Sequence, residues 1–174
     1  MFILISGQSS SGKSRYAEMR LSELSGTPKI YVATSRIYDD EMRERVKKHK
    51  AMREGKGFIT IECPEGLGGI EILEGSSVLI ESLTTWAANE MFTDEGARQS
   101  GHVSGIILHD LAGILDRAGN VIVVADDLFS DGVDYDPSTM DYIRLMAELH
   151  VRLAELADEV IECVSGCPVH YKRP

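Results

Sequence analysis

Eight residues near the amino terminus have the types and spacing of a loop that binds phosphate. The segment 7–14 reads GQSSSGKS and fits the pattern G-x-x-x-x-G-K-[ST]. Glycines at its corners let the backbone turn successive N–H groups inward, where they can surround an anion. Lys13 can then reach the β- and γ-phosphates of a nucleotide, which gives it a catalytic role, and the Ser14 hydroxyl can ligate Mg²⁺. The nucleotide-binding residues expected in this loop are Gly7, Gln8, Ser9, Ser10, Ser11, Gly12, Lys13 and Ser14.

A bound Mg²⁺ also needs a carboxylate, which usually stands at the end of a nearby strand. Two predicted strands end in acidic residues: one in Glu81, the other in Asp126 and Asp127. Ligands of open α/β sheets bind outside the carboxyl ends of the strands, so both ends can face the phosphates. The metal ligands we expect are Ser14, Glu81 and Asp126. The alternative role for such acids is to cap the segments that follow the strands.

A second group of candidate residues lies on a predicted helix over residues 39–53. Residues four apart share a helix face, so Arg45, His49 and Arg53 line up. Neighbouring cations favour the neutral form of the imidazole, which is a nucleophile. The two guanidinium groups can also hold a triphosphate bidentately. On spacing alone, a solvated basic face with an incidental histidine is the alternative interpretation.

Short apolar runs alternate with helix-length amphipathic segments, which predicts a mostly parallel sheet covered by helices, an α/β fold. The opening run of apolar residues is typical of a central strand that is buried on both faces. It leads directly into the phosphate loop, and the helix that follows directs its positive end at the same point. We predict strands at 2–6, 29–33, 58–62, 78–81, 120–125 and 159–164, helices at 13–25, 39–53, 83–92, 103–117 and 137–157, and a loop over 93–101.

The composition of the 174 residues favours one folded domain over 1–174. Acidic residues outnumber basic ones by 28 to 18, a net charge of −10, which argues against nucleic acid as the partner. The longest uncharged stretch is too short to span a bilayer, and the amino terminus lacks the basic region of a signal peptide. Three cysteines form a poor disulfide framework and are expected to be reduced thiols. The expected location is the cytoplasm.

Taken in order, the motifs resemble those of the bifunctional adenosylcobinamide kinase / adenosylcobinamide-phosphate guanylyltransferase family of cobalamin biosynthesis. The resemblance is strongest up to residue 64, fair over 78–89 and weaker after that. The DDEM block with its arginine and histidine is the specific part, since a general phosphate-loop kinase has no need of it. The matching pieces are GQSSSGKS, YVAT at 31–34, DDEM at 39–42 with Arg45, Val46 and His49, TIE at 60–62 with Pro64, and ESLTTW at 81–86 with Asn89.

The resemblance implies two reactions. A nucleoside triphosphate, ATP or GTP, phosphorylates the aminopropanol hydroxyl of adenosylcobinamide. GTP then transfers GMP to a histidine, releasing pyrophosphate, and the GMP passes to adenosylcobinamide phosphate. The nucleotide-accepting histidine of the family falls on His49. The resemblance further implies a RecA-like P-loop fold of three α/β/α layers, a homotrimer with the active site between subunits, Mg²⁺ as cofactor, a corrinoid substrate, and nucleotide contacts from Thr34, Arg45, Arg53, Glu62 and Glu81.

Several positions depart from the pattern of the family. Glu81 stands where the family has aspartate, and Phe58 where it has tryptophan. The segment 126–132 reads DDLFSDG where the family has N-E-V-G-x-G. These changes bear on the recognition of cobinamide more than on nucleotide binding. Two other functions therefore stay open: a P-loop transferase with a different acceptor, and a nucleotide-binding paralogue without turnover.

Overall fold

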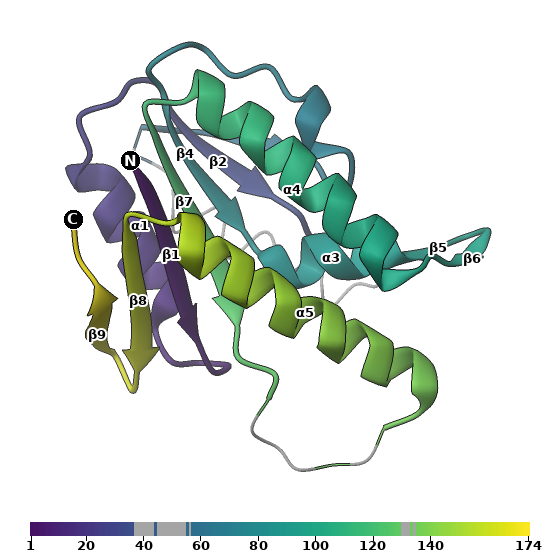
Figure 1. The fold of residues 1–174 in the computed structure, drawn as a ribbon. Coiled ribbons are helices and arrows are strands. Elements are labelled where there is room, and N and C mark those ends of the chain that lie inside the picture. Colours follow the sequence, from purple (N-terminus) through teal and green to yellow (C-terminus); the bar gives the residue numbers. More distant parts are fainter. Residues whose placement is uncertain (37–43, 45–54, 56, 130–132, 134) are drawn as a thin grey trace.

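A computed structural model describes the chain except for residues 37–43, 45–54, 56, 130–132 and 134 (Figure 1). One sheet has the spatial order β3-β2-β4-β7-β1-β8-β9. Its strands are parallel except for β9, which pairs antiparallel with β8. The mostly parallel α/β sheet is therefore confirmed. The strands are β1 (Phe2–Gly7), β2 (Lys29–Ala33), β3 (Phe58–Glu62), β4 (Ser77–Glu81), β7 (Asn120–Asp126), β8 (Glu159–Val164) and β9 (Cys167–Lys172).

Helices cover both faces of this sheet, as Figure 1 shows. On one face α1 (Lys13–Glu23) packs against β1, β4, β7 and β8. On the other face lie α3 (Leu83–Met91), α4 (Ser100–Arg117) and α5 (Pro137–Leu156). A short 3₁₀ turn, η1 (Leu67–Gly69), lies between β3 and β4 and contacts α4. The expected three layers, α/β/α, are confirmed.

Two apolar cores hold the layers together, because successive side chains of a strand point to opposite faces of a sheet. Ile3 and Ile5 of β1 pack with Leu21 in the core beneath α1. Leu4, between them, packs with Trp86 in the larger core beneath α3, α4 and α5. All five side chains are almost fully buried. Burying a side chain of this size stabilises a fold by about 1.5–3 kcal/mol, so the opening strand anchors both layers.

The predicted loop over 93–101 is wrong at both of its ends. β5 (Phe92–Thr93) and β6 (Gly96–Ala97) form a small antiparallel hairpin. Its turn is closed by the Thr93 hydroxyl, which donates to the carbonyl of Gly96 at 2.9 Å. Gly96 has a φ of 121°, which favours glycine, and this position allows the tight reversal. The helix that follows begins at Ser100, three residues earlier than predicted.

The antiparallel strand β9 was also missed by the sequence analysis. Ser165 and Gly166 link it to β8, and both have positive φ, 48° and 85°. Two adjacent residues with positive φ are typical of the tight hairpin turns that match the twist of the flanking strands. The residues of β9 are mostly exposed, so they lack the apolar alternation by which a strand is usually predicted.

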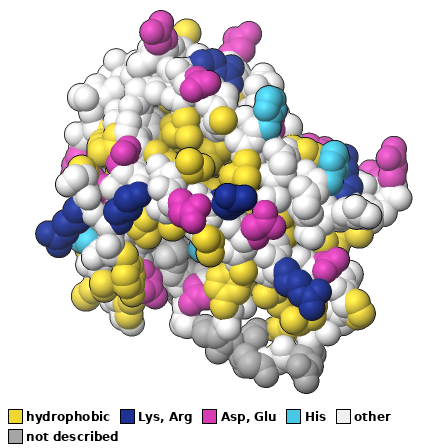
Figure 2. Space-filling model, in the orientation of Figure 1, with side chains coloured by type: hydrophobic (Ala, Val, Ile, Leu, Met, Phe, Trp, Pro, Cys, Tyr) yellow, Lys and Arg dark blue, Asp and Glu magenta, His cyan; other side chains and the backbone are white. Residues whose placement is uncertain are grey.

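Charged side chains are interspersed on the face that carries α4 and α5 (Figure 2). Lysines and arginines lie singly among aspartates, glutamates and hydrophobic side chains on the described part of this face. Among the described residues, no helix is both long and apolar enough to cross a membrane.

Candidate nucleotide-binding site

The phosphate loop between β1 and α1 has the backbone that its glycines predict. Gly7 and Gly12 have φ values of 154° and 90°, and Ser10 between them has a φ of 60°. A Cβ atom on Gly7 would lie 2.6 Å from the carbonyl oxygen of Cys163 and 2.6 Å from the hydroxyl of Ser11. Within the loop the N–H of Ser11 donates to the carbonyl of Gln8 at 3.1 Å. Because Cys163 and Ser11 come so close to the position of that Cβ atom, only glycine fits at position 7.

The turn between β8 and β9 supports the loop from outside. The N–H of Gly166 donates to the carbonyl of Ser11 at 2.8 Å. An added Cβ on Gly12 would approach the Cα of Gly166 to 3.4 Å, which is ordinary contact. The sequence-distant hairpin thus packs directly on the loop and holds its second half in place.

Helix α1 presents its positive end to the loop. Gly12 is its N-cap and makes no side-chain cap hydrogen bond, and the first turn contains no acidic residue. The first backbone N–H groups of a helix have no intrahelical partner, and the helix dipole adds a partial positive charge there. An anion held by the loop would therefore meet these groups. Ser14, the expected metal ligand of the motif, lies half-buried in this first turn.

Lys13 and Asp126 meet at the carboxyl edge of the sheet. The Nζ atom of Lys13 lies 2.6 Å from Oδ1 of Asp126 and donates to the carbonyl of Gln8 at 3.1 Å. The Lys13 side chain is 9% exposed and that of Asp126 is 30% exposed. The predicted catalytic lysine and one predicted metal ligand are thus brought together, with the carboxylate still open to solvent.

Glu81 lies on the same face of the sheet as Asp126. In the register of the sheet Glu81 pairs with Val124, and Asp126 follows Val124 by two residues. Val124 belongs to the core beneath α1, so alternation directs both carboxylates to the α1 side, where the phosphate loop ends. The hydroxyl of Tyr31, on the neighbouring strand, donates to Glu81.

These side chains fit the requirements of Mg²⁺ at a nucleotide. Such an ion usually keeps several waters and takes one or two carboxylates together with phosphate oxygens. The described residues contain no cluster of three or more His, Cys, Asp or Glu that could hold a metal unaided. Ser14 and the half-open carboxylate of Asp126, beside Lys13, would supply protein ligands, and Glu81 stands on the same face.

Thr34 occupies the end of β2, where it bonds to the chain that leaves β4. Its hydroxyl accepts a hydrogen bond from the N–H of Ser82 at 2.8 Å and donates to the Ser82 carbonyl at 3.1 Å. Its N–H donates to the carbonyl of Glu81 at 3.0 Å. Thr34 is fully buried, whereas Glu62, at the end of β3, is exposed. Hydrogen bonds therefore join the ends of β2 and β4, where the sequence predicts nucleotide contacts.

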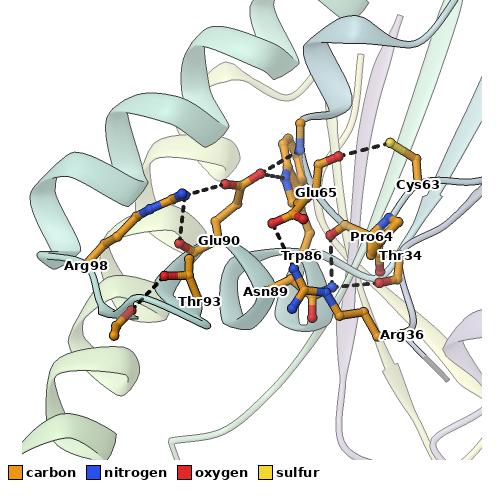
Figure 3. Close-up of polar contacts among 12 residues, drawn as sticks. Thr34, Arg36, Cys63, Pro64, Glu65, Trp86, Asn89, Glu90, Thr93 and Arg98 are labelled. Carbon is orange, nitrogen blue, oxygen red and sulfur yellow. Dashed lines mark hydrogen bonds and ion pairs between the residues drawn. The ribbon is translucent and has the colours of Figure 1, made fainter. Parts of the chain in front are cut away.

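Asn89 of α3 has a role that sequence reasoning missed (Figure 3). Its buried amide nitrogen donates to the carbonyls of Thr34 and Pro64, at 2.8 and 2.9 Å. Those carbonyls follow β2 and β3, at the point where pairing between the two strands ends. A second link between the same segments is the ion pair of Arg36 and Glu65 at 2.8 Å. Asn89 thereby fixes the spacing of two strand exits at the site edge.

Glu90, the next residue, is a buried carboxylate with three kinds of partner. It accepts from the N–H of Gly66 at 2.7 Å and from the indole N–H of Trp86 at 3.4 Å. Arg98 pairs with its second oxygen at 3.1 Å. Charged groups are rarely buried unless they are paired in this way. The four-residue spacing of Trp86 and Glu90 on one helix face was the only sequence signal for this network.

A cavity of about 510 Å³ opens beside the phosphate loop. Its wall includes Tyr142 of α5, whose hydroxyl donates to the carbonyl of Thr84 at 2.7 Å. Burial raises the pKa of Tyr142, and the negative charge of Asp126 raises it further, so this group stays a phenol at neutral pH. The described residues that line the cavity are Gln8, Asp127, Leu128, Tyr135, Thr139, Tyr142 and Ile143.

Residues 3–171 match the family model described as cobinamide kinase / cobinamide phosphate guanyltransferase. The matched span includes the phosphate loop and the strand ends around it. The chain belongs to this family. The family resemblance read from the motifs is therefore confirmed, and with it the assignment to transferase enzymes of cobalamin biosynthesis.

Curated relatives of the cobinamide kinase family match along almost their whole length. The chain is 31% identical to the bifunctional adenosylcobalamin biosynthesis protein CobP of Pseudomonas aeruginosa, over 97% of this chain and 96% of that protein. It is 29% identical to the corresponding protein CobU of Salmonella typhimurium, over 99% of this chain and 100% of that protein.

Solved structures support the fold. The flagellar accessory protein FlaH of Methanocaldococcus jannaschii aligns with a TM-score of 0.50 at 12% identity, over 99% of this chain and 78% of that one. A prototypical ATPase from the type III secretion system of pathogenic bacteria aligns with a TM-score of 0.50 at 17% identity, over 92% of this chain and 50% of that one. The expected RecA-like P-loop fold is thereby confirmed.

The second predicted group of site residues lies outside the described residues. This group comprises His49, Arg45 and Arg53 on the helix predicted over 39–53, of which the structure describes Glu44 alone, as helical. Their roles in this member of the cobinamide kinase family stay predictions. The described site therefore consists of the phosphate loop, the Lys13–Asp126 pair, the tied strand ends and the cavity beside the loop.

Proposed function

We propose that the chain phosphorylates adenosylcobinamide with ATP or GTP, and then transfers GMP from GTP through His49 to adenosylcobinamide phosphate. The observation that carries this proposal is the phosphate loop, closed over Lys13 with Asp126 beside it, in a chain of this family. A loop of this shape binds the phosphates of a nucleotide. We further propose that Thr34, Glu62 and Glu81 line the nucleotide site from the neighbouring strand ends.

In the phosphorylation step, the protein mainly positions and neutralises charge. The loop N–H groups and the first turn of α1 hold the β- and γ-phosphates, and Lys13 offsets charge on the bond that breaks. The acceptor oxygen forms a bond to the γ-phosphorus while the bond to the β-phosphate oxygen breaks. Ser14, Asp126 and Glu81 would hold Mg²⁺, which would neutralise charge on the phosphates.

In the guanylyl step, His49 is the nucleophile. Its imidazole nitrogen forms a bond to the α-phosphorus of GTP, and pyrophosphate leaves with the electron pair of the broken P–O bond. Arg45 and Arg53 hold the phosphate oxygens, and Lys13 offsets charge on the pyrophosphate. A phosphate oxygen of adenosylcobinamide phosphate then attacks the same phosphorus, and the N–P bond breaks to restore the histidine.

The oligomeric state, the domain organisation, the location and the class of substrate are also proposals. The homotrimer implied by the family resemblance, with the active site between subunits, suits a chain whose site residues come from widely separated segments. One sheet runs through both ends of the chain, which supports a single domain over 1–174. All three cysteines are free thiols, as expected in a reducing compartment such as the cytoplasm. The net charge of −10 favours small-molecule substrates over nucleic acid.

Two labelled nucleotides test this function. With γ-labelled ATP or GTP, the purified protein should phosphorylate adenosylcobinamide, and with α-labelled GTP it should carry label to adenosylcobinamide phosphate. Lys13→Ala should reduce both reactions sharply. Phosphorylation of some other alcohol in place of adenosylcobinamide would favour the transferase with a changed acceptor, which the segment 126–132 suggests. Tight nucleotide binding without either reaction would favour a paralogue without turnover.

A further inference from the structure

Asp126 and Asp127 are neighbours in sequence but lie on different sides of the sheet edge. Asp126 is the last residue of β7 and faces Lys13 on the α1 side. The N–H of Asp127 donates to the carbonyl of Gly7 at 3.0 Å, which extends the pairing of β7 with β1 by one residue. Successive side chains then point to opposite faces. Asp127 accordingly lines the cavity on the α5 side, which Tyr142 of α5 also lines.

The carboxylate of Asp127 is oriented by its own loop. Its Oδ1 atom accepts a hydrogen bond from the N–H of Phe129 at 3.0 Å. Of the described residues that line the cavity, Asp127 carries the only carboxylate. Two tyrosines, Tyr135 and Tyr142, also line the cavity, and the Tyr142 hydroxyl already donates its hydrogen to the Thr84 carbonyl. The described lining therefore places one oriented carboxylate, that of Asp127, in the cavity beside the phosphate loop.

The cavity meets the phosphate loop at Gln8, the residue that follows the first glycine. A molecule in the cavity would therefore lie beside the outer phosphate that the loop holds. The wall combines tyrosine rings and aliphatic side chains with a carboxylate and an amide, and its volume of about 510 Å³ is that of a small-molecule site. Such a lining suits an amphiphilic alcohol that carries amide groups.

We propose that this cavity binds the alcohol arm of the acceptor, and that Asp127 is the general base of the phosphorylation step. The hydroxyl oxygen attacks the γ-phosphorus, the hydroxyl proton moves to the Asp127 carboxylate, and the β-phosphate oxygen leaves with the electron pair of its bond. Nucleoside diphosphate and the phosphate ester are the products. The inference rests on the proposed function and adds to it the acceptor site and the base.

The test compares Asp127→Asn with a matched Asp→Asn change outside the site. The side chain of Asp141 on α5 is 51% exposed, pairs with Arg144 at 3.2 Å and is absent from the lining, so Asp141→Asn is the control. Both proteins are assayed for cobinamide phosphorylation, for nucleotide affinity and for labelling of the protein by α-labelled GTP. In Asp127→Asn we expect kcat for phosphorylation to fall about 10²–10⁴-fold, the usual contribution of a general base. Nucleotide affinity and protein labelling should stay unchanged.

A second variant tests the cavity itself. Ile143→Trp fills space in the wall without touching a charge, and it should raise KM for cobinamide at least about tenfold while KM for nucleotide stays the same. Unchanged phosphorylation by Asp127→Asn would overturn the role of the base. Equal loss of phosphorylation and of nucleotide affinity in Asp127→Asn would place Asp127 at the nucleotide and also overturn the proposal. If the wild-type protein does not phosphorylate cobinamide at all, the proposed function fails instead.

Discussion

The ammonium group of Lys13 and the carboxylate of Asp126 lie 2.6 Å apart at the mouth of the phosphate loop. The lysine begins α1, and the aspartate ends β7, the strand next to β1. The sheet therefore brings a cation that can neutralise phosphate charge and a carboxylate suited to a metal to one point. Both steps of the proposed chemistry depend on this pair.

Lys13 and Asp126 should contribute to the free energy of unfolding as a coupled pair. Asp126→Asn removes the charge that faces a nearly buried ammonium, and should lower the free energy of unfolding by about 1–3 kcal/mol. Lys13→Met should lower it by a similar amount. Because each change removes the same interaction, the double variant should fall short of the sum by about 0.5–3 kcal/mol. Urea unfolding of the four proteins measures this coupling, and strictly additive values would show that the two groups do not interact.

Gly7→Ala should damage the phosphate loop. The new methyl group would lie 2.6 Å from the backbone oxygen of Cys163, so strand β8 or the loop must move. We expect a loss of about 1–3 kcal/mol in stability and at least tenfold weaker triphosphate binding, measured by calorimetry.

Gly105→Ala is the matched control for this change. Gly105 lies exposed on α4, and its added Cβ would meet nothing within 4 Å. Alanine favours the helix, so stability should rise by about 0.5–1 kcal/mol while nucleotide affinity stays the same. If both alanine variants bound nucleotide as well as the wild type does, the loop would not require the backbone described for Gly7.

Glu90→Ala should destabilise the edge of the site beneath α3. The change leaves the N–H groups of Gly66 and Trp86 without their acceptor and Arg98 without its partner. We expect thermal and urea unfolding to report a loss of about 2–4 kcal/mol. Glu90→Gln retains an acceptor oxygen and should lose clearly less. An equal loss in the two variants would mean that the hydrogen bonds shown in Figure 3 are not the source of the effect.

Asp136 at the start of α5 should make stability depend on pH. Its carboxylate accepts from the N–H groups of Ser138 and Thr139 and from both of their hydroxyls. These bonds hold the pKa of Asp136 well below its usual range. The folded pKa is thus below the unfolded value of about 4, so the contribution is complete above pH 4 and is lost as the pH falls toward the folded value.

Asp136→Ala should therefore lower Tm at pH 7 and lower it less at pH 3. Calorimetric scans of both proteins at the two pH values measure the difference. A Tm difference that is the same at pH 3 as at pH 7 would contradict a cap that acts through the ionised carboxylate.

The phosphate loop and most strands were predictable because their signals are local. Gly7, Gly12 and Lys13 stand at fixed spacing between an apolar run and a helix, and the structure follows that pattern. The pairing of Lys13 with Asp126 could be expected from the common edge of parallel strands. Strand β9 could not, because its exposed residues carry no apolar alternation and the two-residue turn before it is a weak signal.

Contacts between buried polar groups could not be predicted from the sequence. Asn89 belongs to a block that resembles the family, but its contacts and those of Glu90 follow only once the ends of β2 and β3 are placed beside the helix. The separate orientations of Asp126 and Asp127 likewise depend on where pairing with β1 stops. Such roles follow from tertiary structure, and spacing along the chain does not encode them.

Transfer of the guanylyl group from GTP to His49 has one direct test. The protein is incubated with GTP and Mg²⁺, and its intact mass is measured without acid. We expect a mass increase equal to one guanylyl group, lost on mild acid treatment and absent in His49→Asn. A protein that binds GTP but gains no mass, or a His49→Asn variant that gains it as the wild type does, would contradict guanylyl transfer through His49.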